Sequence, residues 1–577
     1  MFGQRVMAVC WAIDPSVDVH TAAIGLGGDV AEGMAAGNVL RQKQIQRDST
    51  VSKSTKYWRR FSGRRLLNLI IAVSAIAISY EGMSQGVMGA VVVAPEFAHR
   101  MQFANADGVV TRPTLQGGIV SIYYAGSLFG GFFAGGFSDK YGRIKGMQMA
   151  CFWCFAGVVL QAAAIDLPML LVARVVAGIG VSFILAIAPS WTAELSSASH
   201  RGHVIALTFL ANFSGIALAS WIGFGTSFSN AANGQFRWRF TFATQLIPVS
   251  LLIIGTFLIP ESPRWLMKER REDEAMEIVA KLRGEGDSDH PDAQREFREM
   301  QAVVEMEREH ESTNYIKMFF GIGSGDVHLG RRIQLAFWLQ VLMQYGTGIA
   351  AVVVYSGTIF RNAGFDDLKS NWLSALNNMV GILGTGIAAL TLDRVGRRRT
   401  LYWGAVVLSI ILFIIGGLNR GAIQHPEQKE QYSTAAASFV FIYVLIFSSS
   451  WLLIPFIYPT EIFPTWVRAK GNAFGVAGWA VGYGGGSLLV PIMFDGIQEK
   501  TYYVFGAAML CYIPLVYCFL PETCGRTLEA MDFLFASKSP FTWDEEREFS
   551  IRMDVLQSQL ATEEKVYTTY IEKGDPL

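Results

Sequence analysis

The sequence predicts an all-α membrane protein with twelve transmembrane helices, arranged as two pseudo-symmetric six-helix bundles joined by an intracellular helical linker. Three observations favour this fold class. Hydrophobic residues make up 51% of the 577 residues and charged residues only 17%. The apolar residues form runs of about 20, the length that a helix needs to cross a bilayer. One string of charges also occurs twice in the same order, which indicates the duplicated architecture of a secondary transporter.

The N-terminal part is expected to hold six membrane spans. Residues 1–65 lack the basic-then-apolar pattern of a cleaved signal peptide, so we expect a flexible cytosolic tail there. Residues 66–266 form the predicted N-terminal bundle, because six long apolar stretches follow one another in it. The expected spans are 66–93, 115–137, 147–165, 168–191, 203–227 and 241–260.

A charged stretch, residues 267–330, separates the sixth span from the seventh. Ala275, Ile278, Val279 and Leu282 recur in it at helical spacing. Apolar residues on one face of an otherwise charged helix favour short amphipathic helices that lie outside the bilayer core. We therefore expect an intracellular helical linker between the two bundles.

The C-terminal part repeats the pattern of the N-terminal part. Residues 331–520 form the predicted second six-helix bundle, and residues 521–577 form a predicted cytosolic segment. The expected spans are 333–360, 372–392, 401–418, 436–457, 470–494 and 502–520. Lys and Arg residues gather before the first span and after the second and the eighth. Since basic short loops mark the cytoplasmic side, both termini and the linker are expected in the cytosol.

Each half carries one set of charges at the edges of its spans. The two sets are Asp139, Arg143, Glu194 and Arg201 in the first half, and Asp393, Arg397, Glu461 and Arg468 in the second. A charged loop at a helix end is easily solvated, so one set alone would indicate topology only. Because the order is duplicated, we favour ionic latches between cytoplasmic helix ends, which form when those ends close and break when they separate.

The strings around these charges resemble the sugar porter family of the major facilitator superfamily. They run in order over about residues 65–535: Gly135-Gly-Phe-Ser-Asp139-Lys-Tyr-Gly-Arg143, Arg174-Val-Val-Ala-Gly178-Ile-Gly180, Pro189-Ser-Trp-Thr-Ala-Glu194, Pro260-Glu-Ser-Pro-Arg-Trp265, Asp393-Arg-Val-Gly-Arg397, Tyr458-Pro-Thr-Glu-Ile-Phe-Pro464 and Pro521-Glu-Thr-Cys-Gly-Arg526. One such string is weak, but the ordered set is specific. The resemblance, nearest the fungal branch, implies alternating access for monosaccharides or related polyols.

The resemblance also implies where a sugar would bind. Each hydroxyl of a sugar needs a partner once water is removed, so amides and indoles inside spans are candidate contacts. Gln344 stands at a sugar-binding glutamine of the family, and Trp479 at one of its tryptophans. Tyr345 stands where the family has a second amide, and Phe456 where it has another tryptophan.

Other polar residues inside spans complete the predicted substrate contacts. A family asparagine falls at Gly381 here, and the neighbouring asparagines could replace it. The further candidates are Asn377, Asn378, Asn212 and Gln85. For each polar candidate, the alternative is a hydrogen bond between helices. Several family amides are exchanged for apolar or aromatic groups, so a pentose, a deoxysugar, a polyol and a sugar acid stay open as substrates.

Glu81 is the one carboxylate deep inside a predicted span. Proton-coupled family members carry an aspartate where this chain has Ser84, and Glu81 lies one turn earlier on the same helix face. The family's arginine in the fourth span is Arg174. A nearby cation favours the ionised carboxylate, whereas burial favours the protonated one. We expect Glu81 to load a proton and Arg174 to tune it; the alternative is a carboxyl fixed by hydrogen bonds, with uncoupled transport.

The sequence thus predicts a plasma-membrane secondary transporter for a monosaccharide or polyol, with proton symport. An uncoupled facilitator and a sugar-acid transporter are the alternatives, and a nutrient receptor without transport is a weaker one. No nucleophile–base pair, nucleotide loop or metal-ligand spacing is evident, so we expect neither an enzyme nor a cofactor or metal site. The expected partners are the sugar, protons and the lipid bilayer; a net charge of zero gives no reason to expect nucleic acid.

Overall fold

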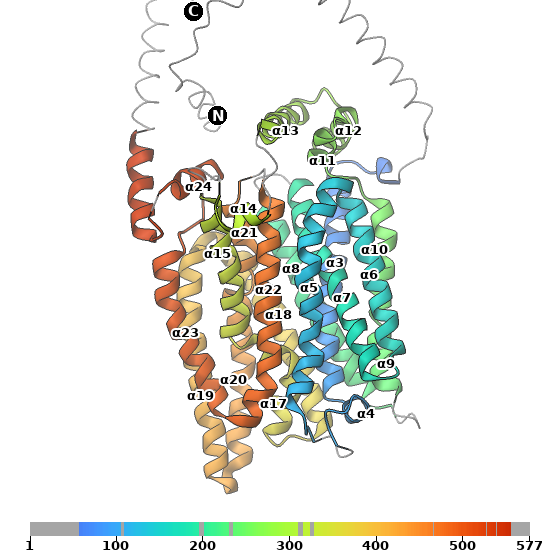
Figure 1. Cartoon of the computed structure of the whole chain (residues 1–577), viewed down its shortest axis with the longest axis vertical. Helices are drawn as coiled ribbons and strands as arrows, with labels where there is room; N and C mark the ends of the chain where they lie inside the picture. The colour runs from blue at the N-terminus through green and yellow to red at the C-terminus, as the bar shows by residue number, and fades with distance from the viewer. Residues whose placement is uncertain are drawn as a thin grey trace, which may run out of the picture. The chain divides into compact units, whose positions relative to one another are not determined.

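The structure is a computed structural model that describes residues 57–105, 109–195, 201–229, 235–309, 315–322, 328–464, 467–526, 528–537 and 539–555. The regular elements assigned in these ranges are helical. Figure 1 shows long helices running side by side, with shorter helices across one end. Residues 1–56 of the predicted tail lie outside the described residues. The chain enters its first long helix at Gly63, slightly before the predicted start.

The first half folds into one group of helices. They are α3 (Gly63–Val92), α4 (Pro95–Arg100), α5 (Pro113–Tyr141), α6 (Arg143–Ala163), α7 (Leu167–Leu195), α8 (Arg201–Thr226), α9 (Phe236–Ala243) and α10 (Leu246–Leu258). Gly142 separates α5 from α6 with a φ of 100°. That region of backbone conformation suits glycine, because it has no Cβ to clash, and here it lets the chain reverse direction between two spans.

Four helices follow in the predicted linker: α11 (Pro263–Lys268), α12 (Glu272–Arg283), α13 (Pro291–Glu309) and α14 (Tyr315–Phe319). The apolar residues that indicate an amphipathic helix are buried on α12. Arg59, in the short helix η1 (Tyr57–Arg60), donates to Glu277 of α12 at 2.8 Å. The linker therefore packs against the start of the first half.

The second half repeats the arrangement. Its helices are α15 (Leu329–Val341), the π-helical turn η3 (Leu342–Gly346), α16 (Ile349–Val354), α17 (Ser356–Asn362), α18 (Asp367–Val395), α19 (Arg397–Gln424), η4 (Pro426–Gln428), α20 (Lys429–Ser450), α21 (Ile454–Ile462), α22 (Arg468–Gly496), α23 (Lys500–Phe519) and α24 (Leu528–Phe535). Gly396, with a φ of 93°, separates α18 from α19 as Gly142 separates α5 from α6. The duplicated strings thus adopt the same local structure.

The seventh predicted span, 333–360, is not one continuous helix. It consists of α15, η3, α16 and α17, because the chain unwinds around Gly346 and Gly348. Gly348 has a φ of 75°, and a Cβ there would lie 2.8 Å from the ring of Phe505. The Tyr443 hydroxyl donates to the buried Thr347 carbonyl at 2.6 Å. Irregular backbone at membrane depth needs such a partner, since neighbouring lipid offers none.

Eleven helices within the described residues are long and apolar enough to cross a membrane, and the broken seventh crossing is the further one that the sequence predicts. Large apolar side chains point outward along the long helices: Phe129, Phe133, Phe257, Leu383 and Leu390 are each more than half exposed. An exterior of this kind suits lipid rather than water. The prediction of an all-α, multi-pass membrane fold is confirmed.

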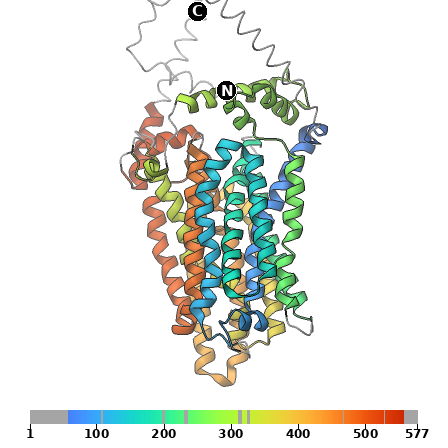
Figure 2. The same ribbon diagram turned by 45° about the vertical axis from the view of Figure 1, so that its right-hand side comes forward.

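The elements next to the predicted tail, linker and C-terminal segment lie at the same end of the long helices. Figures 1 and 2 show η1, α11 to α13 and α24 there, whereas α4 lies at the opposite end. Contacts group the described residues, which begin at 57 and end at 555, into one compact unit. The boundaries at 266, 330 and 520 therefore stay predictions, as does the assignment of that end to the cytosol.

Candidate functional site

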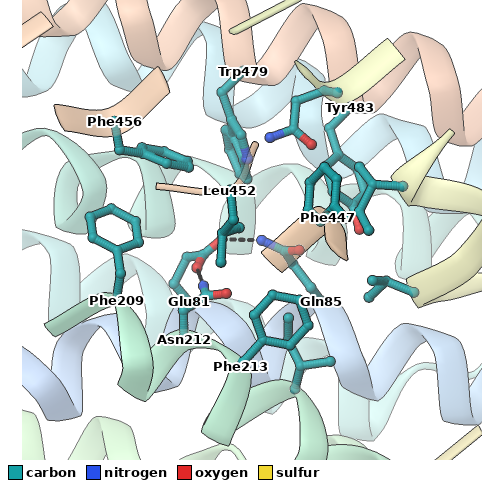
Figure 3. A pocket seen from close by; sticks show the side chains of 14 residues that line it. Glu81, Gln85, Phe209, Asn212, Phe213, Phe447, Leu452, Phe456, Trp479 and Tyr483 are labelled. Atoms are coloured by element: carbon teal, nitrogen blue, oxygen red, sulfur yellow. Dashed lines mark hydrogen bonds between the residues drawn. The ribbon is translucent and has the colours of Figure 1, made fainter. Parts of the chain in front are cut away.

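A cavity lies between the two groups of helices, lined by side chains from both (Figure 3). The first group contributes residues of α3 and α8, and the second contributes residues of η3, α16, the α20–α21 region and α22. The lining residues are Glu81, Gln85, Phe209, Asn212, Phe213, Ile216, Gln344, Ile349, Val353, Phe447, Leu452, Phe456, Trp479 and Tyr483. A site shared by the two halves is where alternating opening of either side would expose a bound molecule.

Glu81 is the charged member of this lining, and it is 2% exposed. Its carboxylate accepts hydrogen bonds from two amides, Gln85 Nε2 and Asn212 Nδ2 (Figure 3). Gln85 follows Glu81 by one turn of α3, so the two side chains share a helix face. Asn212 reaches the carboxylate from α8. The carboxylate is therefore oriented by neutral donors rather than by a cation.

The broken seventh crossing brings Gln344 to the cavity. Gln344 lies in the π-helical turn η3 and is 4% exposed. Its Oε1 atom is buried and has no hydrogen-bond partner among the described residues. The hydroxyl of Tyr483, also in the lining, is likewise buried and unpartnered. Buried polar atoms normally have partners, so these two atoms are positions at which a bound molecule can donate or accept.

Aromatic rings form much of the remaining wall. Phe209 of α8 and Phe456 of α21 face each other across the two halves, with ring centroids 4.6 Å apart. Tyr124 of α5 stacks on Tyr483 at 4.9 Å and meets the edge of Trp479 at 5.2 Å. Rings in contact across the junction keep the cavity narrow in this conformation.

Most of the predicted substrate contacts converge on this cavity. Gln344, Trp479, Phe456, Asn212 and Gln85 line it, together with Glu81.

Three predicted contacts do not line it. Asn378 donates to Ser220 Oγ at 2.8 Å and so joins α18 to α8. Asn377 donates to the Val352 carbonyl at 3.3 Å. Tyr345 is 42% exposed, because consecutive residues of a helix point in different directions and Gln344 takes the inward one. Both asparagines thus form hydrogen bonds between helices, which was the alternative to a substrate contact that the sequence left open.

The sequence did not predict Phe213, Phe447 or Tyr483 as site residues. Tyr483 follows the selected Trp479 by four residues, and Phe213 follows the selected Asn212 by one, on a helix that already supplied a contact. Helical spacing from Trp479 was the available signal for Tyr483. No such signal pointed to Phe447, because its position in the cavity wall depends on how α20 packs against the other helices.

Arg174 lies outside the cavity lining. It is 2% exposed, its Nη2 atom donates to the Val120 carbonyl at 3.2 Å, and its guanidinium lies 4.5 Å from the centroid of the Tyr123 ring. Burial against a ring and a carbonyl gives this cation a structural role in joining α7 to α5. No ion pair between Arg174 and Glu81 is among those of the described residues, so direct tuning of Glu81 has no geometric support in this conformation.

The charge cluster of the first half lies within its own group of helices. Arg143 forms ion pairs with Asp139 at 3.0 Å and with Glu194 at 3.1 Å, which joins α6 to α5 and α7. Glu261 accepts from the Arg143 backbone N–H at 2.8 Å. The pKa of the Glu261 carboxyl is raised because the group is buried. Hydrogen bonds from the backbone N–H groups around it offset part of this rise. The side chain of Arg201 lies outside the described residues.

The cluster of the second half has the same geometry. Arg397 pairs with Asp393 at 2.9 Å and with Glu461 at 2.8 Å. Its backbone N–H donates to Glu522 at 2.9 Å, as that of Arg143 donates to Glu261. Arg468 Nη2 donates to the Phe463 carbonyl at 3.3 Å. The ion pairs of Arg143 and of Arg397 given above each join helices of the same half.

Other residues close the junction at the end where the linker lies. Asn472 of α22 donates to Ser190 of α7 at 3.2 Å. Tyr315 of α14 packs against both Phe132 of α5 and Phe474 of α22, at centroid distances of 5.7 and 5.8 Å, and these two rings also contact each other at 5.5 Å. An aromatic ring from the linker therefore contacts one helix of each half.

Comparison with known proteins agrees with this geometry. The profile of the family described as "Sugar (and other) transporter" matches residues 67–535. A probable quinate permease of Aspergillus clavatus is 30% identical over 507 residues, covering 85% of this chain and 90% of the relative. A high-affinity glucose transporter of Kluyveromyces lactis is 27% identical over 523 residues, covering 88% and 91%.

Solved structures share the fold. The proton:xylose symporter XylE bound to 6-bromo-6-deoxy-D-glucose superposes with a TM-score of 0.67 at 23% identity, covering 82% of this chain and 99% of that one. XylE from E. coli in a partially occluded inward-open conformation gives a TM-score of 0.65 at 22% identity, covering 80% and 100%. The chain therefore belongs to the sugar (and other) transporter family of the major facilitator superfamily, a family of membrane transporters rather than enzymes.

Proposed function

We propose that this member of the family is a secondary transporter of the plasma membrane that moves a monosaccharide, a polyol or a related ring compound by alternating access, coupled to protons through Glu81. Both termini then lie in the cytosol. One observation carries the proposal: a buried carboxylate lines a cavity that the two halves share. Such a group sits where the substrate passes, so its charge can follow the opening and closing of the cavity.

The physical basis of coupling is the solvation of Glu81. An ionised carboxylate is stable when the cavity opens to water, but it is costly when the cavity closes around it without a cation. Within the described residues, the partners of Glu81 are the two neutral amides of Gln85 and Asn212. A proton that binds before closure removes the charge, and it leaves when the opposite side opens. Substrate and proton would then cross in the same closed state.

The test replaces the carboxyl by an amide of the same shape. Glu81→Gln should abolish uphill accumulation of labelled D-glucose or 6-deoxy-D-glucose under an inward proton gradient, and should leave exchange without a gradient intact. Proteoliposomes measure both in one preparation. Glu96→Gln removes the same charge from an exposed position of α4 and serves as the matched control. Accumulation by the Glu81→Gln variant at the wild-type level would overturn the proposal.

An uncoupled facilitator is the second candidate. The two amides already satisfy Glu81, which is what a carboxyl fixed for structure alone would show. In that case the wild type equilibrates its substrate and never accumulates it, with or without a proton gradient. A sugar-acid substrate is less favoured, because the cavity lining includes a carboxylate and neither lysine nor arginine. Uptake of any labelled probe would argue against a receptor without transport.

For the two charge clusters, we propose a role as braces within each half. Arg143 and Arg397 each hold two carboxylates and a helix end of the same half. Rigid halves are needed if the molecule changes state by rocking, because a soft bundle would deform instead. The closure of the linker end is then carried by contacts such as Asn472 with Ser190 and Tyr315 with Phe132 and Phe474.

A further inference from the structure

The lining of the cavity has few polar groups beside a larger number of rings and aliphatic side chains. Glu81, Gln85 and Asn212 form one polar cluster, in which both amides already donate to the carboxylate (Figure 3). Gln344, the Tyr483 hydroxyl and the indole N–H of Trp479 are the other polar groups of the lining. Among the described residues, Gln344 Oε1 and the Tyr483 hydroxyl are buried and have no hydrogen-bond partner. The remaining lining residues are apolar or aromatic: Phe209, Phe213, Phe447, Leu452 and Phe456, with Ile216, Ile349 and Val353.

This distribution sets a limit on how many hydroxyls the closed cavity can satisfy. A hexopyranose carries hydroxyls around its whole ring, and each one loses water when the cavity closes. A hydroxyl placed against Phe209 or Phe456 finds no partner there, and an unmade hydrogen bond in a buried place weakens binding strongly. A ring with hydroxyls on one edge only can instead place its C–H surface against the aromatic wall.

We propose that the cavity selects hydroxyl-poor rings, such as deoxygenated sugars, over fully hydroxylated ones. This inference rests on the proposed function, since it names the substrate class of that transporter. The polar edge of the ring bonds to Gln344, Tyr483 and the amides near Glu81, and the apolar edge packs against Phe209 and Phe456. In this conformation the centroids of the two rings lie 4.6 Å apart. The apolar edge of the substrate enters between these rings and moves them apart.

The experiment compares three probes with the same ring: D-glucose, 6-deoxy-D-glucose and 2,6-dideoxy-D-glucose. Binding is measured on the full purified chain in detergent through the shift of its thermal midpoint with probe concentration. Affinity should rise at each loss of a hydroxyl, with the dideoxy sugar about ten-fold or more tighter than glucose. Equal affinities, the reverse order, or no binding by any of the three would overturn the inference.

A specificity variant makes the test sharper. Phe209→Gln adds an amide to the apolar wall and should move the preference toward glucose by about ten-fold. Phe209→Leu removes the ring without adding a polar group, so it controls for lost packing and should keep the order of the wild type. The unliganded thermal midpoint of each variant shows whether it folds. A Phe209→Gln variant that folds and keeps the wild-type order would count against the inference.

Exchange of labelled 6-deoxy-D-glucose in proteoliposomes separates the two proposals. Exchange with a preference for glucose would overturn the proposed preference for hydroxyl-poor rings, but it would still support transport. Binding in the expected order without exchange would overturn the proposed transport function, but it would still support the preference of the cavity for hydroxyl-poor rings. Exchange in the expected order supports both.

Discussion

At the scale of single residues, the environment of each charge decides its role. Glu81 is buried among neutral amides, Arg174 is buried against a ring and a carbonyl, and Arg143 and Arg397 are each held by two carboxylates. A charge with a fixed opposite partner braces structure, whereas a charge with neutral partners can change its protonation state more readily. Arg174 also has neutral partners, but a guanidinium keeps its proton in proteins. Of these four residues, Glu81 is therefore the one suited to coupling.

The two carboxylates on Arg397 should contribute unequally to stability. The Asp393 side chain is 66% exposed and that of Glu461 is 24% exposed. Asp393→Asn should cost less than about 1 kcal/mol, because water screens an exposed pair. Glu461→Gln should cost about 3 kcal/mol, since it removes the charge of the less exposed partner of a mostly buried arginine. Thermal unfolding in detergent ranks the two variants, and a lower midpoint for Asp393→Asn would contradict the account.

Part of this residue-scale picture was predictable from the sequence. The duplicated strings indicated the charge clusters, and the position of Glu81 inside a span marked it as a functional candidate. The partners were not predictable, because Asn212 reaches Glu81 from a helix more than a hundred residues away. The expectation that Arg174 lies beside Glu81 came from the family resemblance. In the structure Arg174 packs on Tyr123 instead, so this expectation gains no support.

At the scale of helices, close packing depends on residues without side chains at the crossing points. A Cβ added to Gly215 of α8 would lie 2.0 Å from the Ser79 carbonyl oxygen of α3. A Cβ added to Gly82 of α3 would lie 1.9 Å from the Asn212 carbonyl oxygen. Small residues of this kind let helix backbones approach closely in a membrane, where apolar surface alone does not drive association. The same contact brings Asn212 to Glu81.

Gly215→Ala should therefore destabilise the protein by about 1–3 kcal/mol or more, because the methyl group has to push α3 and α8 apart. The control is Gly118→Ala in α5, where an added Cβ would meet no heavy atom within 4 Å. That variant should be neutral or slightly stabilising, since alanine favours a helix over glycine. Thermal midpoints of the two variants give the comparison; equal losses would show that the α3–α8 crossing is not tight.

The sequence patterns predicted where the helices lie, but they did not predict where a helix is interrupted. Runs of apolar residues predicted the long helices, because length and hydropathy alone set a span. The break in the seventh crossing was missed, since Leu329 to Asn362 reads as apolar on both sides of the unwound turn. Gly346-Thr-Gly348 was the local signal. Only the tertiary partners of that turn, such as Tyr443, make the break stable.

At the scale of the whole molecule, two matching groups of helices meet around one small cavity. The duplication in sequence predicted this arrangement, and the equal geometry of the Arg143 and Arg397 clusters bears it out structurally. The conformational state was not predictable, because one sequence encodes every state of a transporter. In this state, contacts join the halves both at the linker end and at the opposite end.

The opposite end offers a direct test of movement between the halves. Val93, which follows α3, packs against Gly357 of α17, and a Cβ built on Gly357 lies 3.8 Å from the Val93 Cβ. That separation equals the mean of about 3.8 Å between the Cβ atoms of a disulfide. Cysteines at both positions can therefore join the two halves without moving the backbone. Either single substitution serves as the control.

The central claim is that transport requires the two halves to separate at each end in turn. The most direct measurement is exchange of labelled D-glucose or 6-deoxy-D-glucose, whichever the wild type exchanges, by the Val93→Cys, Gly357→Cys double variant before and after oxidation. The account predicts that oxidation stops exchange, that a reductant restores it, and that the single variants are unaffected. Undiminished exchange by the fully cross-linked protein would contradict it.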